Sequence, residues 1–204
     1  MATLITDPVW EEQLRLEREQ SGADRYDEVW EGVYVMTPIA NDEHQQIVVR
    51  LAAILQDILG WPGLGEVRPG INLSDRLDDW KSDYRAPDIA VFLPGGKAEN
   101  CGTHWRGAAD FLAEITSAGD RTHEKIPFYS RLGVRELLVV DRSTWTLELY
   151  RWRAGGLKRV GKSSLDKPDL LRSKVVPLRF RLVAGAARPN IEVTHAESGR
   201  SWLV

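Results

Sequence analysis

The sequence predicts an α/β fold in which a mixed β-sheet is flanked by helices. Apolar residues between positions 41 and 59 recur with the 3.6-residue period of an amphipathic helix. Two short segments, 86–93 and 110–116, are apolar on both faces, as expected for central strands that helices cover. A second amphipathic segment, 124–132, follows these strands and precedes further strand-like segments. This alternation of strands and helices is the pattern of an α/β protein.

The N-terminal elements are a helix, a hairpin and a second helix. Residues 7–20 carry few apolar side chains among many charges and predict a solvent-exposed helix. Residues 26–36 contain two short β-segments around Gly32, which predicts a hairpin. Asn41 is a good N-cap for the next helix, and two acidic residues follow it in the first turn. This helix is expected to end at Gly60.

Strands are expected to dominate the rest of the chain. The helix over residues 124–132 is expected to end at Gly133, because glycine readily adopts the left-handed conformation common just after a helix. The N-terminal hairpin and the C-terminal strands are expected to extend the mixed sheet. Strands are predicted at residues 65–73, 86–93, 110–116, 136–141, 146–152, 175–182 and 191–193.

Composition is that of a soluble globular protein, with 43% hydrophobic and 28% charged residues. The length predicts a single domain, 1–204, with a core over 26–150 and a C-terminal extension over 160–204. No apolar run approaches the roughly 20 residues that span a bilayer, so no membrane partner is expected. A lone cysteine, Cys101, and an N-terminus without signal-peptide features predict a cytoplasmic protein. The net charge of −3 is mild evidence against avid, non-specific nucleic-acid binding.

Two acidic residues interrupt the predicted central strands. Asp88 lies in segment 86–93, and Glu114 lies in segment 110–116. A carboxylate buried in a strand costs several kcal/mol unless another group compensates it. Because the two strands are expected to be neighbours, one divalent cation could compensate both acids.

Two further polar residues are expected at the same end of the sheet. His44 lies on the apolar stripe of the first long helix, and Lys125 heads the stripe of the second, so both should point inward. Two oxygen ligands and a nearby ammonium suit metal-assisted cleavage of a phosphodiester.

Each of these residues also has a structural interpretation. Asp88 fits a simple turn before a strand, and Glu114 could form a buried ion pair with Lys125 or an arginine. Lys125 alone could be a solvated side chain, and His44 a hydrogen-bonded residue at a helix end. Asp120 fits a cap of the following helix.

The order of these residues resembles a known family. Pro87-Asp88, Glu114 and Lys125 are similar to the metal-binding signature of the PD-(D/E)xK nuclease superfamily. The wider context is similar to the Uma-type family of restriction endonucleases, over roughly residues 26–150. The matching segments are Glu31-Gly32-Val33-Tyr34-Val35-Met36, His44, Pro87-Asp88-Ile89-Ala90-Val91, Glu114-Ile115-Thr116-Ser117, Asp120, Lys125, Tyr129, Gly133-Val134-Arg135-Glu136 and Val139-Val140-Asp141.

This resemblance implies a restriction-endonuclease-like fold and a Mg²⁺-dependent (or Mn²⁺-dependent) endonuclease that hydrolyses DNA by a metal-activated water. Asp88, Glu114 and the backbone carbonyl of Ile115 would hold the metal. Lys125 and His44 would complete the catalytic set. The resemblance also implies a homodimer with DNA as its substrate. Supporting roles are expected for Glu31, Thr116, Asp120 and Tyr129.

The chain departs from the superfamily pattern at one position. The superfamily's lysine usually follows the second acid by two residues, where this chain has Thr116. Lys125 must therefore reach back from its helix, close to Pro127. The alternative is a catalytically inactive nuclease-fold protein that binds nucleic acid or another protein.

Overall fold

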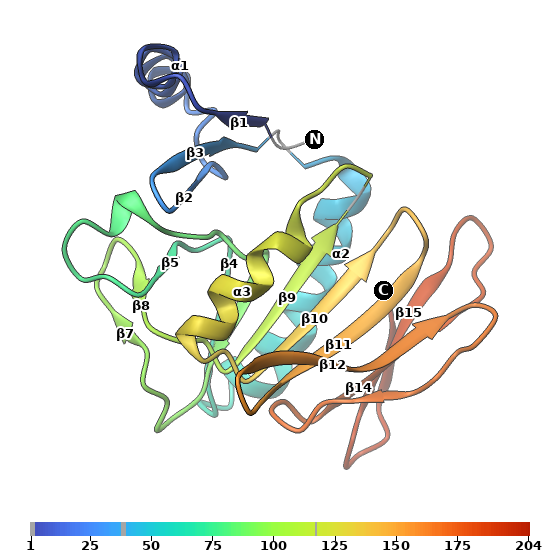
Figure 1. Cartoon of the computed structure of the whole chain (residues 1–204). Helices are drawn as coiled ribbons and strands as arrows, with labels where there is room; N and C mark the ends of the chain where they lie inside the picture. Colours follow the sequence, from blue (N-terminus) through green and yellow to red (C-terminus); the bar gives the residue numbers. More distant parts are fainter. Residues whose placement is uncertain (1–2, 38–39, 117) are drawn as a thin grey trace.

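The computed structural model describes residues 3–37, 40–116 and 118–204. It confirms the predicted fold class: a mixed six-stranded sheet has a helix on each face (Figure 1). The strand order is β12-β11-β10-β9-β6-β4, and β9 and β10 are parallel while the other pairs are antiparallel. The strands are β4 (Glu66–Pro69), β6 (Ile89–Phe92), β9 (Phe111–Thr116), β10 (Glu136–Asp141), β11 (Thr146–Arg153) and β12 (Gly156–Ser164).

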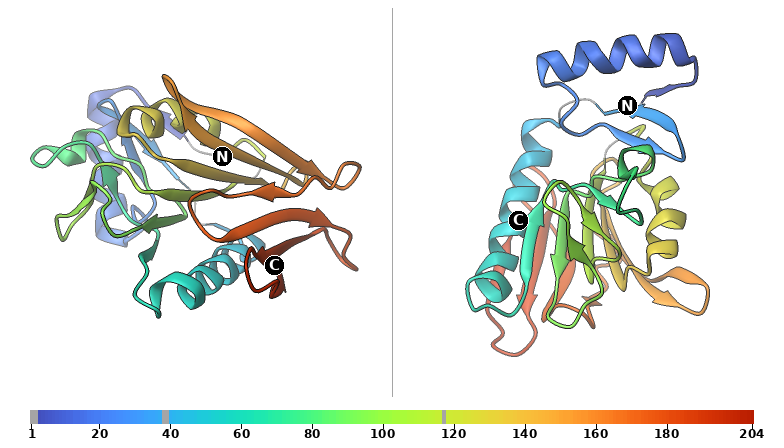
Figure 2. Two further views of the ribbon diagram at one scale, coloured as in Figure 1. Left: turned by 90° about the horizontal axis from the view of Figure 1, so that it is seen from below. Right: turned by 90° about the vertical axis from the view of Figure 1, so that its left-hand side faces the viewer.

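Helices α2 (Asp42–Leu55) and α3 (Thr122–Leu132) cover opposite faces of this sheet, as Figure 2 shows. A π-helical turn, Gln56–Gly60, continues α2 to the predicted end. Side chains alternate between the faces along each central strand. In β9, Ile115 therefore packs in the core beneath α2, and Leu112 packs in the core beneath α3.

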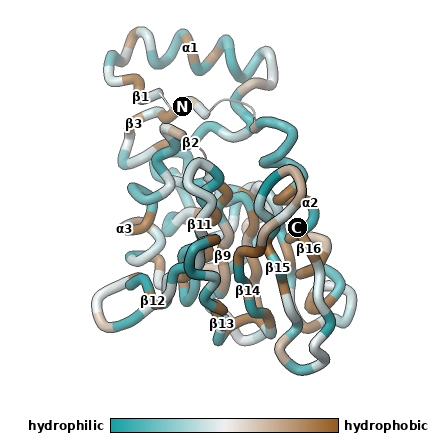
Figure 3. The backbone as a smooth tube through the Cα atoms, turned by 90° about the vertical axis from the view of Figure 1, so that its right-hand side faces the viewer, coloured by the Kyte–Doolittle hydropathy of each residue, from teal (hydrophilic) through white to brown (hydrophobic). Residues whose placement is uncertain are grey.

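The C-terminal strands form a second sheet instead of extending the first one. This four-stranded antiparallel sheet packs against the face that carries α2, where Phe180 stacks on Phe111 with ring centroids 6.2 Å apart. Figure 3 shows hydrophobic stretches on β9 and β14, in contrast to the mostly hydrophilic N-terminal helix α1 (Pro8–Ser21). The strands are β13 (Leu171–Arg172), β14 (Leu178–Val183), β15 (Asn190–His195) and β16 (Ser201–Leu203).

The predicted N-terminal hairpin also belongs to a separate sheet, with order β1-β3-β2. Its turn uses left-handed backbone at Glu31 (φ 51°) and Gly32 (φ 86°), which suits a tight two-residue connection. The hairpin and α1 lie across one end of the central sheet (Figures 1 and 2). These elements are β1 (Thr3–Ile5), α1 (Pro8–Ser21), β2 (Glu28–Trp30) and β3 (Val33–Met36).

One predicted strand, 65–73, is divided into two. Gly70 adopts φ 57° after β4, so the chain turns and β5 (Leu73–Ser74) joins a small sheet with β8 (Trp105–Arg106) and β7 (Glu99–Asn100). A short 3₁₀ turn, Trp80–Ser82, lies in the loop that follows β5. Among the described residues, no helix is long and apolar enough to cross a membrane.

Candidate active site

A cleft with a volume of about 520 Å³ lies at the end of the central sheet. Strands β9 and β10 are parallel and both finish there, and the antiparallel strand β6 begins there. Helices α2 and α3 begin at the same end, where the β2–β3 hairpin also lies (Figure 1), and residues of the hairpin line the cleft. Residues far apart in the sequence therefore share one cavity.

Asp88 directly precedes β6 and is held by two partners. Its Oδ1 lies 2.8 Å from His44 Nε2, and its Oδ2 accepts a hydrogen bond of 2.7 Å from the Ile115 N–H. His44 is placed by the start of α2, because the Asn41 side chain accepts a hydrogen bond from its backbone N–H. The Asp88 side chain keeps 20% exposure to the cleft.

Glu114 lies in the middle of the sheet and is 3% exposed. Its Oε1 accepts a hydrogen bond of 2.5 Å from the Tyr129 hydroxyl and lies 3.4 Å from Lys125 Nζ. Helix α3 begins at Thr122, two residues earlier than expected, so Lys125 lies within the first turns and reaches Glu114. The ion pair that the sequence left open as an alternative for Glu114 is thus present.

Glu28 of the hairpin completes this cluster, and sequence reasoning missed it. Its Oε1 lies 2.8 Å from Lys125 Nζ and accepts a hydrogen bond of 2.7 Å from the Ala86 N–H. Its Oε2 accepts one of 2.6 Å from Trp30 Nε1. Local pattern gives no sign of this role, because the burial of Glu28 depends on how the hairpin docks against distant segments.

Burial and neighbouring charges shift the protonation of this cluster. Burial, with help from the charges of Asp88 and Glu28, raises the pKa of Glu114, and Lys125 only partly opposes the rise. Burial also disfavours the charge on Lys125. The negative charges of Glu114 and Glu28 outweigh this effect of burial and raise the pKa of the Lys125 ammonium. Lys125 is therefore a cation and cannot serve as a proton acceptor near neutral pH.

The remaining predicted site residues fall in different places. Asp120 lines the cleft and accepts hydrogen bonds from the Thr122 N–H (2.8 Å) and hydroxyl (2.6 Å); it directly precedes Arg121, the N-cap residue of α3. Thr116 is buried at the end of β9. Glu31 is not among the residues that line the cleft; its side chain is 70% exposed and pairs with Arg131. Ser117 lies outside the described residues.

The oxygen atoms at this site fit a hard divalent cation. Glu28, Asp88 and Glu114 line one cleft, where Lys125 contacts Glu28 and Glu114 and His44 contacts Asp88. In a strand the N–H and C=O of one residue face the same side, so the Ile115 carbonyl lies on the β6 side of β9, as its N–H does. Two carboxylates and a carbonyl are ligands that Mg²⁺ accepts, with water completing its shell. No group of three or more His, Cys, Asp or Glu side chains is preassembled among the described residues.

Comparisons with known proteins agree with this fold. A putative nuclease of the DUF820 group from Anabaena variabilis superposes with a TM-score of 0.56 at 18% identity, covering 72% of this chain and 80% of that chain. None of the curated proteins matches the chain. The sequence profile of the Uma2 family, described as "putative restriction endonuclease", matches residues 10–184. The chain therefore belongs to the Uma2 family.

Proposed function

We propose that this protein is a Mg²⁺-dependent endonuclease that hydrolyses DNA phosphodiester bonds. The observation that carries the proposal is the meeting of Asp88 and Glu114, from neighbouring strands, in one cleft beside Lys125. Membership of the Uma2 family supports a nuclease. The raised pKa of Glu114 supports a cation site, because it indicates that groups of the chain do not fully compensate its charge.

Asp88, Glu114 and the Ile115 carbonyl would hold the Mg²⁺. When bound, the metal supplies Lewis-acid activation of a water and neutralises charge on the phosphate. Lys125 remains protonated and stabilises the negative charge that develops on the phosphoryl oxygens. His44 orients Asp88 through its hydrogen bond.

Two further features of the cleft favour an anionic substrate. The N-termini of α2 and α3 both lie at the cleft, and helix N-termini favour negative charge. Arg25, Arg121 and Arg142 line the same cavity; Arg121 pairs with Glu124 and Arg142 with Glu43. A phosphodiester backbone would thus meet favourable potential on its way to the carboxylates.

The test is nicking of supercoiled DNA by the wild type, Glu114→Gln and Glu31→Gln. We expect nicking that needs Mg²⁺ or Mn²⁺, stops with EDTA and is lost in Glu114→Gln. Glu31→Gln is the matched control, because its side chain lies outside the cleft, and it should retain activity. Circular dichroism must show that Glu114→Gln is folded. DNA binding without any metal-dependent nicking would instead support the inactive binding module.

A further inference from the structure

Asp88 and Glu114 lie in a cleft that the β2–β3 hairpin lines on its other side. Glu28, Trp30 and Val35 of the hairpin line the cleft opposite the sheet. Glu114 is almost fully buried at its base. A phosphate must therefore enter between the hairpin and the sheet to reach the candidate metal ligands.

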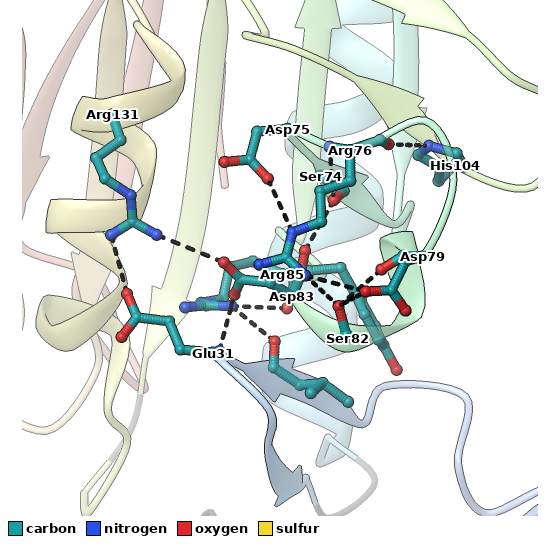
Figure 4. A network of polar contacts seen from close by, with 12 residues as sticks. Glu31, Ser74, Asp75, Arg76, Asp79, Ser82, Asp83, Arg85, His104 and Arg131 are labelled. Carbon is teal, nitrogen blue, oxygen red and sulfur yellow. Dashed lines mark hydrogen bonds and ion pairs between the residues drawn. The ribbon is translucent and has the colours of Figure 1, made fainter.

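The hairpin is held firmly in this position, as Figure 4 shows. The Asp83 carboxylate accepts hydrogen bonds from the Glu31 N–H (3.0 Å) and from Arg85 Nη1 (2.9 Å). Arg85 also donates to the Val29 carbonyl at 2.8 Å. Arg131 of α3 pairs with Glu31 at 3.3 Å and with Asp83 at 3.5 Å.

Opening the hairpin would break the hydrogen bonds that the buried Asp83 and Arg85 side chains make to the Glu31 N–H and the Val29 carbonyl. Hydrogen bonds to charged groups contribute about 1.5–3 kcal/mol each. A substrate therefore meets the cleft with the hairpin in place.

The volume of this cleft suits a single nucleotide. A volume of about 520 Å³ falls within the roughly 300–1,000 Å³ of sites that enclose a single small ligand. A continuous duplex is stiff over roughly 150 base pairs, so bringing one of its phosphates to the buried Glu114 requires local bending or unstacking. A single strand bends freely and needs no such cost.

The rim of the cleft carries groups that bind single strands. Tyr26 is partly exposed there, and its ring has no stacking partner among the described residues. Trp30, in contrast, already packs against Arg85 and Arg121. Arg142 also lines the cleft; its Nη1 donates to Asn41 Oδ1 at 2.6 Å and lies 3.3 Å from Glu43, and its buried Nε has no hydrogen-bond partner within the described part of the chain. Aromatic rings that stack on bases and arginines that follow the backbone are the usual means of binding single-stranded DNA.

We propose that the cleft takes single-stranded DNA, with a base stacked on Tyr26 and a phosphate bound by Arg142. This inference rests on the proposed nuclease function, since it names the substrate of the same site. Frayed ends, gaps and loops in duplex DNA would present such a strand.

The first experiment compares one labelled strand in three forms: alone, in a continuous duplex, and opposite a gap. With Mg²⁺, we expect cleavage of the free and gapped forms about tenfold or more faster than cleavage of the duplex. Equal or faster cleavage of the continuous duplex would overturn the inference and leave the nuclease proposal standing.

Binding separates the two proposals if no form is cut. Fluorescence anisotropy in Ca²⁺ should show the free strand binding about tenfold or more tightly than the duplex. That result without any cleavage would support the single-strand inference and refute the nuclease. Equal affinity for both forms would refute the inference.

Variants at the rim test the contacts themselves. Tyr26→Ala should weaken single-strand binding about tenfold, and Tyr26→Phe should not, because the ring remains. Arg142→Gln should also weaken binding and lower its salt dependence. Trp152→Ala is the control, since Trp152 is an exposed aromatic that does not line the cleft. Unchanged affinity in Tyr26→Ala and Arg142→Gln would contradict the assignment.

Discussion

Replacing Glu28 by alanine should destabilise the fold markedly, although this residue lies in a short hairpin strand. The change removes a buried partner of Lys125 and the acceptor of the Ala86 N–H and the Trp30 Nε1–H. Loss of one partner from a buried ion pair costs about 3–5 kcal/mol. Lys125 keeps Glu114 as a second partner, so the loss of this ion pair should cost about 3 kcal/mol, at the lower end of that range. The two N–H groups that lose their acceptor add about 1 kcal/mol each. We expect a total of about 3–5 kcal/mol.

Urea denaturation followed by tryptophan fluorescence measures this loss directly. For a chain of this size it corresponds to a fall in Tm of roughly 6–20 °C. Glu31→Ala is the control, because its exposed pair with Arg131 should contribute less than about 1 kcal/mol. A Glu28→Ala variant as stable as Glu31→Ala would refute the role of Glu28 in holding Lys125.

Three other substitutions test the packing and electrostatics of the fold. Phe180→Ala should lower the free energy of unfolding by about 3–5 kcal/mol, since Phe180 is buried between the two sheets; a urea midpoint near that of the wild type would contradict this. Gly133→Ala should cost about 1–2 kcal/mol in the same assay, because Gly133 has φ 88° after α3, and an unchanged midpoint would count against the strain. Burial opposes the charge on Glu148, but hydrogen bonds from Tyr150 and neighbouring cations lower its pKa. Glu148→Gln should therefore destabilise at pH 7, and the difference should shrink as the pH falls below 4.5; a difference that does not depend on pH would exclude this linkage.

Local sequence signals predicted most elements because they depend on neighbouring residues. The predicted strand at 136–141 is β10, and Asn41 caps α2 as expected. The sheet that each strand joins depends on pairing between distant segments. Local patterns do not contain this information. The C-terminal strands, which the sequence predicts as an extension of the central sheet, therefore form a sheet of their own.

The site residues that belong to apolar strand segments could be predicted from the sequence. Asp88 and Glu114 stood out because a carboxylate is unusual in an apolar strand. Glu28 did not stand out, since only docking of the hairpin buries it. The direction of the Lys125 side chain depends on where α3 begins, at Thr122, whose N–H and hydroxyl donate hydrogen bonds to Asp120.

Isothermal calorimetry of divalent-ion binding tests the central claim most directly. We expect the wild type to bind one Mg²⁺ or Mn²⁺ per chain, and Asp88→Asn and Glu114→Gln to lose this binding while remaining folded. Glu31→Gln should bind as the wild type does. Binding that survives in both Asp88→Asn and Glu114→Gln, or no binding by the folded wild type, would contradict a metal site formed by Asp88 and Glu114.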